Sequence, residues 1–295
     1  MILHPGDEVA LILPAAQLPD AEAGLLEEAA GLLESWGLRA TMRAERANHF
    51  YLAGTDAARA AHLQAALADP AIRAIFGARG GYGSMRLLPY LESGLDPVEK
   101  FLVGFSDITA LHLVAAKLWP RVRALHGPNI ASRHFLGDRP ETERNRVALR
   151  QALFDPDYRV KAPVIFLHEG RASGPLIGGC LSLIAAMLGS GFVPDTKEYI
   201  LFLEDVREAP YRIDRMLVQL RNAGVFSGVA GVVFGEMQEC NDDINDLREI
   251  IRDVLAEFSF PIAFGLPAGH GPTNIALPLG SRAVLDSTKG CFLLA

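Results

Sequence analysis

The chain is short of cysteine and of positive charge. Its three cysteines, Cys180, Cys240 and Cys291, stand far apart among 295 residues. Their odd number and wide spacing predict neither a disulfide framework nor a metal cluster, and they fit a reducing compartment. The formal net charge is −7 and no run of basic residues stands out. Electrostatics therefore gives no reason to expect nucleic acid or an anionic membrane as a partner, and a small substrate is favoured.

Signals for export and for membrane insertion are also missing. The first 16 residues include a short apolar stretch, but they carry two acidic residues and no basic leader, so no signal peptide is predicted. The uncharged segment 176–193 is just long enough to raise the question of a membrane span. Because four glycines interrupt it, we interpret it as a short buried helix with flexible ends. We therefore expect a cytoplasmic protein.

The composition is that of a folded globular protein, with 50% hydrophobic and 21% charged residues. In the first half, short apolar runs typical of buried strands alternate with amphipathic stretches typical of helices. The predicted strands are 9–13, 38–42, 72–76 and 101–105, and the predicted helices are 21–36, 55–67 and 108–118. This alternation predicts an α/β domain with a mostly parallel sheet covered by helices. Ligands of such sheets bind beyond the carboxyl ends of the strands.

A charged, proline-containing segment marks the predicted domain boundary. We expect an N-terminal α/β domain over 1–137, a connecting segment over 138–171 and a C-terminal domain over 172–295. The second part contains predicted strands at 199–203, 229–234 and 284–285 and a predicted helix at 211–220.

Gly104-Phe105-Ser106-Asp107 lies between a predicted strand and a predicted helix, where a nucleophile elbow would lie. A sharp turn there presents the serine hydroxyl at a helix N-terminus, near backbone N–H groups that can stabilise an oxyanion. The usual G-x-S-x-G pattern has a second glycine where this chain has Ile108. Taken locally, the commoner alternative is that Ser106 or Asp107 caps the helix.

The segment Arg79-Gly80-Gly81-Tyr82-Gly83-Ser84 also follows a predicted strand. It does not fit the dinucleotide fingerprint, because Arg86 stands where a glycine is needed, and it lacks the Gly-Lys-Ser/Thr of a phosphate-binding loop. It predicts a turn whose backbone can approach a ligand closely, for example as a second oxyanion donor. An ordinary tight strand–helix turn fits the segment equally well.

A serine nucleophile needs an imidazole base and a carboxylate that orients it. Among eight histidines, His126 and His270 lie in glycine-containing loops, and His270 is preferred because glycines flank it on both sides. Glu204 and Asp205 end a predicted strand, and only one of two adjacent strand residues can face a site. Ion pairs with nearby arginines are the alternative for both carboxylates. No H-E-x-x-H motif or comparable ligand spacing is present, so no metal site is predicted.

Several segments together resemble one family, the LD-carboxypeptidases or muramoyltetrapeptide carboxypeptidases, whose sister branch contains the microcin C immunity peptidases. They stand in the family's order along nearly the whole chain, and each is weak alone but specific as part of the set. They include Arg79-Gly80-Gly81-Tyr82-Gly83-Ser84, Gly104-Phe105-Ser106-Asp107, His126-Gly127-Pro128, Leu203-Glu204-Asp205-Val206 and Gly269-His270-Gly271.

The resemblance implies two domains, an N-terminal parallel α/β sheet and a C-terminal β-barrel-like α+β domain. It implies a catalytic triad of Ser106, Glu204 and His270, and an oxyanion hole formed by the backbone N–H groups of Gly81 and Asp107. The implied activity is that of a cytoplasmic serine carboxypeptidase of cell-wall recycling, which releases terminal D-alanine from murein tetrapeptides without a cofactor. Family members often form dimers, so a homodimer is expected as well.

Substrate recognition is less well determined by the sequence. The terminal carboxylate of a peptide needs a cationic or N–H partner, and Arg79 and Arg212 are candidates that fit structural ion pairs equally well. Tyr82 is a third candidate for substrate contact. Cys180 departs from the family, which has asparagine there. Two rival functions stay open: a microcin-type peptidase that cleaves acylated aminoacyl-nucleotide conjugates, and a catalytically silent peptide-binding protein.

Overall fold

The computed structural model describes residues 1–44, 48–91, 95–241 and 246–294. The chain divides into a first compact unit, Met1–Pro156, and a second compact unit, Asp157–Ala295. The division falls inside the segment 138–171 that the sequence predicted as a connection, and the helix Pro140–Phe154 belongs to the first unit. Across the described ranges, no helix is both long and apolar enough to cross a membrane.

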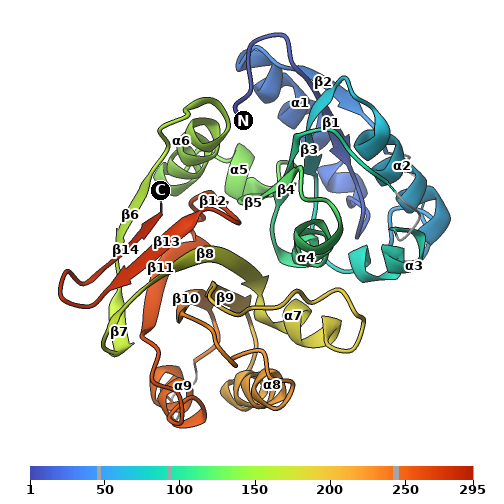
Figure 1. Cartoon of the computed structure of the whole chain (residues 1–295). Coiled ribbons are helices and arrows are strands. Elements are labelled where there is room, and N and C mark those ends of the chain that lie inside the picture. The colour runs from blue at the N-terminus through green and yellow to red at the C-terminus, as the bar shows by residue number, and fades with distance from the viewer. Residues whose placement is uncertain (45–47, 92–94, 242–245, 295) are drawn as a thin grey trace. The chain divides into compact units, whose positions relative to one another are not determined.

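The first unit alternates strands and helices as predicted (Figure 1). Its strands are β1 (Glu8–Ile12), β2 (Arg39–Met42), β3 (Ile72–Gly77), β4 (Lys100–Gly104) and β5 (Val122–His126). Its α-helices are α1 (Leu25–Ser35), α2 (Asp56–Ala68), α3 (Leu88–Leu91), α4 (Thr109–Leu118), α5 (Arg133–Leu136) and α6 (Pro140–Phe154). The strands pair in parallel in the order β5-β4-β3-β1-β2. The prediction of an N-terminal parallel α/β domain is confirmed.

Burial explains why these runs become strands and helices. Every residue of β4 is buried, which suits a central parallel strand covered on both faces. Helix α1 buries one stripe that includes Leu26 and Leu33, and it ends two residues before Gly37, which has a φ of +89°. Trp36, next to that end, packs edge to face against Phe135 and Phe154, so α1, α5 and α6 form one layer.

The strand order has a switch point in the first unit. Strand β1 is followed by α1 and β2 on one side and has β3 on its other side, so the connections diverge between β1 and β3. Open α/β sheets bind ligands outside the carboxyl ends of the strands near such a switch point. The glycine-rich segment follows β3 and Ser106 follows β4, so both lie at this edge of the sheet (Figure 1).

The second unit is built around a mixed sheet. The strands of this unit are β6 (Val160–Pro163), β7 (Ile165–His168), β8 (Arg171–Cys180), β9 (Ile200–Val206), β10 (Gly231–Gln238), β11 (Ile262–Gly269), β12 (Leu277–Pro278), β13 (Arg282–Asp286) and β14 (Cys291–Leu294). Its helices are α7 (Leu181–Met187), α8 (Pro210–Asn222) and α9 (Leu247–Val254). An eight-stranded sheet runs in the order β6-β14-β13-β8-β9-β10-β11-β7.

That sheet curls around a single apolar core. Side chains from strands across the whole order pack into one buried cluster that includes Val160, Leu176, Phe202, Val233, Ala263, Leu285 and Phe292. The two edge strands, β6 and β7, are consecutive in the chain. The sheet is therefore nearly closed, and the prediction of a barrel-like C-terminal domain with added helices is confirmed.

Segment 176–193 contains the predicted short buried helix, but the prediction of a flexible end before it was wrong. Residues up to Cys180 belong to strand β8, and helix α7 covers only Leu181–Met187. A Cβ on Gly178 would lie 1.8 Å from the carbonyl oxygen of Phe202, so this glycine marks close approach of β8 to β9. In the sequence the same glycine looked like a helix breaker, because only the partner strand shows why it is needed.

Candidate active site

Ser106 sits in a sharp strand-to-helix turn. Strand β4 ends at Gly104, and Ser106 has a φ of +61° before the 3-10 turn Ser106–Ile108 leads into α4. Left-handed backbone is costly for a residue with a Cβ and is found where function requires it. No side chain caps either the turn or α4. The alternative that Ser106 or Asp107 is simply a helix cap was therefore wrong.

The glycine-rich turn lies directly against this serine. A Cβ on Gly80 would lie 3.2 Å from Ser106 Oγ, and Gly81 has a φ of +96°. The Ser84 backbone N–H donates a 2.7 Å hydrogen bond to Asp107 Oδ2. The two segments predicted to supply oxyanion donors are therefore neighbours within the first unit.

Asn129 is a supporting residue that the sequence reasoning missed. It is buried, and its Oδ1 accepts a 3.2 Å hydrogen bond from the N–H of Phe105, next to Ser106. Its Nδ2 would lie 3.1 Å from a Cβ on Gly80, so the amide touches both the elbow and the glycine turn. His126, at the end of β5, is fully buried and packs edge to face on Phe105. Both residues hold the turn that presents Ser106.

In the second unit, Glu204 and His270 form a buried acid–imidazole pair. Glu204 is on β9, and His270 follows the end of β11; strand β10 pairs with both of these strands. Nδ1 of His270 lies 2.6 Å from Glu204 Oε2, which also accepts the backbone N–H of His270 at 3.1 Å. The Glu204 carboxylate is fully buried. This contact turns the Nε2 side of the ring away from the carboxylate.

Gly269 makes that contact sterically feasible. It has a φ of +125°, and a Cβ there would lie 2.6 Å from Glu204 Oε2. The expectation that flanking glycines aim His270 therefore has a physical basis at Gly269. Asn274, which the sequence reasoning missed, accepts the Gly269 N–H at 2.9 Å. The signal available was a shared pattern, since His-Gly-Pro is followed closely by asparagine after both His126 and His270.

The surroundings of His270 favour its charged form. Burial alone lowers the pKa of the imidazole, but the charge and hydrogen bond of Glu204 outweigh it, so the pKa lies above its ordinary value. Such a group is neutral, and able to accept a proton, only at higher pH than a free histidine.

Asp205 has a different role from its neighbour. Its carboxylate accepts the backbone N–H groups of Ser182 at 2.7 Å and Val206 at 2.8 Å, and so holds the start of α7. Burial raises the pKa of Asp205 to about 6. Cys180 is buried nearby, with its Sγ 3.2 Å from the Ser182 hydroxyl, and burial raises the pKa of its thiol.

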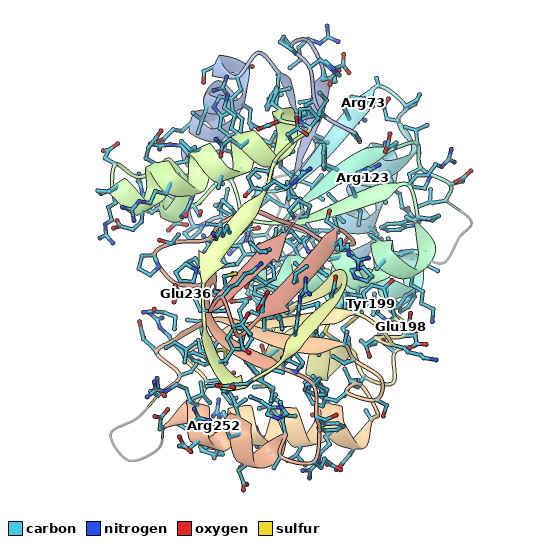
Figure 2. The ribbon with its side chains drawn as sticks, turned by 60° about the vertical axis from the view of Figure 1, so that its left-hand side comes forward. Arg73, Arg123, Glu198, Tyr199, Glu236 and Arg252 are labelled. Carbon is cyan, nitrogen blue, oxygen red and sulfur yellow. The ribbon has the colours of Figure 1, made fainter. Side chains whose placement is uncertain are left out.

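A second carboxylate lies beside the histidine loop. Glu236, labelled in Figure 2, lies on β10 and is half-buried, and a Cβ on Gly271 would lie 2.6 Å from its carboxyl carbon. Burial raises the pKa of Glu236. Nothing in the local pattern of the sequence singled out this residue.

The three predicted substrate-binding residues lie on the surface of their own units. Arg79 pairs with Glu22, and Arg212 on α8 pairs with Glu208 at 3.4 Å. Tyr82 is 46% exposed, with its ring centroid 6.1 Å from that of Tyr51. The Arg79 pair is partly buried and the Arg212 pair is more exposed, and ion pairs near the surface contribute little stability.

The predicted triad residues divide between the two units. Ser106 belongs to the first, and Glu204 and His270 belong to the second. Within the described ranges, no group of three or more His, Cys, Asp or Glu side chains is arranged to hold a metal ion. Each unit thus contains one part of the predicted nucleophile–base–acid set.

The fold is that of a two-domain serine peptidase. Residues 9–127 match the N-terminal domain of LD-carboxypeptidases, and residues 173–285 match their C-terminal domain. The chain belongs to the LD-carboxypeptidase family, as the sequence resemblance predicted, and it is a peptidase enzyme.

Relatives of similar length support this membership. A Streptomyces coelicolor protein named as a candidate carboxypeptidase is 38% identical over 301 residues, covering 99% of this chain and 94% of the relative. The murein tetrapeptide carboxypeptidase of Pseudomonas aeruginosa is 33% identical over 293 residues, covering 95% and 94%.

Solved structures share the whole fold. The muramoyltetrapeptide carboxypeptidase of Oxalobacter formigenes has a TM-score of 0.82 at 28% identity and covers 97% of both chains. An MccF-like protein from Bacillus anthracis has a TM-score of 0.87 at 27% identity, covering 99% of this chain and 98% of its own. MccF in complex with glutamyl sulfamoyl guanosine has a TM-score of 0.85 at 21% identity, covers 100% and 97%, and shows the fold alone.

Proposed function

We propose that this enzyme is a serine carboxypeptidase that hydrolyses the bond between an L-configured residue and a terminal D-alanine in murein tetrapeptides. The observation that carries the proposal is the buried contact between His270 Nδ1 and Glu204 Oε2, 2.6 Å long, in a chain whose Ser106 occupies a strained elbow. The names of the Pseudomonas and Oxalobacter relatives support the choice of substrate. The place of this reaction would be cell-wall recycling in the cytoplasm.

In the proposed reaction, Ser106 Oγ attacks the carbonyl carbon while His270 Nε2 accepts the hydroxyl proton. Glu204 holds the imidazole in the tautomer that leaves Nε2 as acceptor and stabilises the imidazolium. The backbone N–H groups of Gly81 and Asp107 stabilise the oxyanion. As the C–N bond breaks, His270 returns the proton to the amine of D-alanine, which leaves. Water, deprotonated by His270, then hydrolyses the ester and restores Ser106.

Recognition of the leaving group requires a cation or N–H donor for its carboxylate. Arg79 and Arg212 are the proposed partners, and the exposed ring of Tyr82 is proposed to contact the peptide. The enzyme is proposed to act as a homodimer without a cofactor. Neither nucleic acid nor a membrane is proposed as a partner.

A second candidate keeps the chemistry and changes the substrate to a microcin-type aminoacyl-nucleotide conjugate. It is favoured by the likeness to the MccF-like protein and to MccF, whose structure holds glutamyl sulfamoyl guanosine. The third alternative, a silent peptide-binding protein, does not account for the left-handed backbone of Ser106, since binding alone needs no strained hydroxyl.

The test is release of free D-alanine from a purified murein tetrapeptide, with Ser106→Ala as the matched variant. We expect release by the wild type, and turnover lower by roughly three or more orders of magnitude in the variant. A fluorophosphonate, which reacts with activated serines, separates the alternatives. Labelling of Ser106 without D-alanine release would indicate the microcin-type substrate, and absence of both would contradict a serine peptidase.

A further inference from the structure

Arg59 is a buried cation next to the glycine-rich turn. Its side chain, on α2, is fully buried, and Nη1 donates a 3.0 Å hydrogen bond to the carbonyl oxygen of Gly83 and another to that of Pro14. Nε donates to the Gly54 carbonyl at 3.3 Å, and Nη2 pairs with Asp56. A guanidinium buried this deeply requires such partners, because an unpaired buried charge is costly.

Asp107 binds the same turn through its carboxylate. Its buried carboxylate accepts the Ser84 N–H at 2.7 Å. The carbonyl of Gly83 and the N–H of Ser84 belong to one peptide group. That peptide group is therefore held at its oxygen by a buried cation and at its nitrogen by a buried carboxylate. Rotation of the Gly83–Ser84 peptide would break both charge-assisted hydrogen bonds at once.

Other residues pack closely against this turn. A Cβ on Gly83, whose φ is +144°, would lie 2.9 Å from Arg59 Nη1 and 2.7 Å from a methyl of Leu52. Two residues earlier, a Cβ on Gly81 would lie 2.6 Å from Cβ of Ala16. The glycines supply a backbone that would otherwise be free to change conformation, and the two charged side chains remove that freedom.

We propose that Arg59 and the carboxylate of Asp107 are positioning residues that clamp the Gly83–Ser84 peptide and so hold the Gly81 N–H in place for the oxyanion. The inference rests on the proposed function, because Gly81 is a proposed oxyanion donor. Neither side chain touches the substrate in this scheme. Donors of an oxyanion hole act only at hydrogen-bond distance. A small shift of the turn would therefore reduce stabilisation of the transition state more than it reduces binding of the substrate.

The experiment compares Arg59→Met and Arg59→Lys with Arg43→Met, a matched control in the same unit whose guanidinium pairs with Asp69 at 2.6 Å. Three quantities are measured: the rate of Ser106 labelling by a fluorophosphonate, kcat and KM for the tetrapeptide, and the unfolding temperature. In Arg59→Met we expect labelling and kcat to fall together by about 10- to 1000-fold, with KM changed little. Arg59→Lys should retain part of both, and Arg43→Met should retain wild-type labelling.

Asp107 supplies a second test that does not depend on folding of the Arg59 variants. Asp107→Asn keeps an oxygen that can accept the Ser84 N–H, whereas Asp107→Ala removes it. We expect the asparagine variant to label faster and turn over faster than the alanine variant at equal content of folded protein. The clamp is wrong if folded Arg59→Met labels like wild type, or if the two Asp107 variants are equally active.

Labelling also separates this inference from the proposed substrate. If the wild type labels at Ser106 but releases no D-alanine, the substrate proposal fails and the labelling rates still decide the clamp. If wild-type Ser106 does not label, there is no oxyanion site to position, and both proposals fall.

Discussion

The pKa of His270 depends on the contact between its Nδ1 and Oε2 of Glu204. Its Nδ1 faces a fully buried carboxylate oxygen 2.6 Å away, and burial and charge then act on the imidazole in opposite directions. Burial lowers the pKa of His270, but the charge and hydrogen bond of Glu204, together with the charge of Asp205, outweigh that cost, so the net effect raises the pKa. A base with a raised pKa stays protonated, and inactive, to higher pH.

We therefore predict that kcat/KM falls on the acid side with an apparent pKa above 6.5, the ordinary value for histidine. In Glu204→Gln the charge that raises the pKa is gone while burial remains, so the acid limb should move to lower pH. The plateau should fall at the same time. The measurement is the pH profile of kcat/KM for both proteins between pH 5 and 9. An acid limb that stays in place in Glu204→Gln would contradict the assignment of Glu204 as the partner of His270.

Strand alternation separates the roles of two adjacent carboxylates, Glu204 and Asp205. The sequence offered Glu204 and Asp205 and required that only one face the site. In the structure Glu204 meets His270 and Asp205 meets the start of α7. Alternation was readable from the sequence. Which carboxylate faces the histidine depended on β9 and β11 flanking the same strand, β10, because this brings the residues after β11 within reach of Glu204.

At the scale of elements, close contact between two strands explains a glycine that the sequence analysis took for a helix breaker. Gly178 lies where β8 pairs with β9, opposite Phe202. An added Cβ would be 1.8 Å from the Phe202 carbonyl oxygen, and the φ of Gly178 is +138°. The two strands could accept a side chain there only by separating, which would open the core of the second unit.

We predict that Gly178→Ala costs several kcal/mol of the free energy of unfolding, on the order of 4 kcal/mol, and lowers the yield of soluble protein. Gly189→Ala is the control, since that glycine also has a positive φ, +82°, but has nothing within 4 Å of an added Cβ. It should cost only about 1 kcal/mol. Chemical denaturation followed by circular dichroism measures both. Equal losses in the two variants would show that the backbone angle, and not the approach of β9, causes most of the destabilisation.

At the scale of the whole molecule, the proposed chemistry is shared between two compact units. The first unit holds the elbow, the glycine turn and the buried clamp around them, and the second holds the acid and the imidazole. Neither unit carries the complete proposed set. Stability of the second unit should therefore govern the reactivity of a serine in the first.

Phe202→Ala tests this coupling, because Phe202 is fully buried in the core of the second unit. Truncation of a buried phenylalanine costs roughly 3–5 kcal/mol, which should lower the unfolding temperature by on the order of 10 °C. We predict that fluorophosphonate labelling of Ser106, measured along a temperature series, is lost at the same lowered temperature. Labelling that continues after the second unit has unfolded would mean that Ser106 is activated within the first unit alone.

The sequence by itself determined the fold class, the order of the main elements and the short motifs around the candidate triad. These features are local: buried parallel strands are continuous apolar runs, helices show periodic apolar stripes, and the motifs are contiguous residues. Strands β5, β6, β7, β8, β11, β12 and β14 were not identified, because strand formation depends on the partner strands as well as on a strand's own residues.

The tertiary structure decided how residues distant in sequence meet. It excluded a capping role for Ser106, gave Glu204 and Asp205 different partners, and showed Asn129 and Asn274 supporting the two loops. It also placed the buried charges of Arg59 and Asp107 on opposite ends of one peptide group. Apart from the bond of Asn274, these contacts join residues more than 20 positions apart, so no local pattern records them. They exist only once the sheet has brought the ends of its strands together.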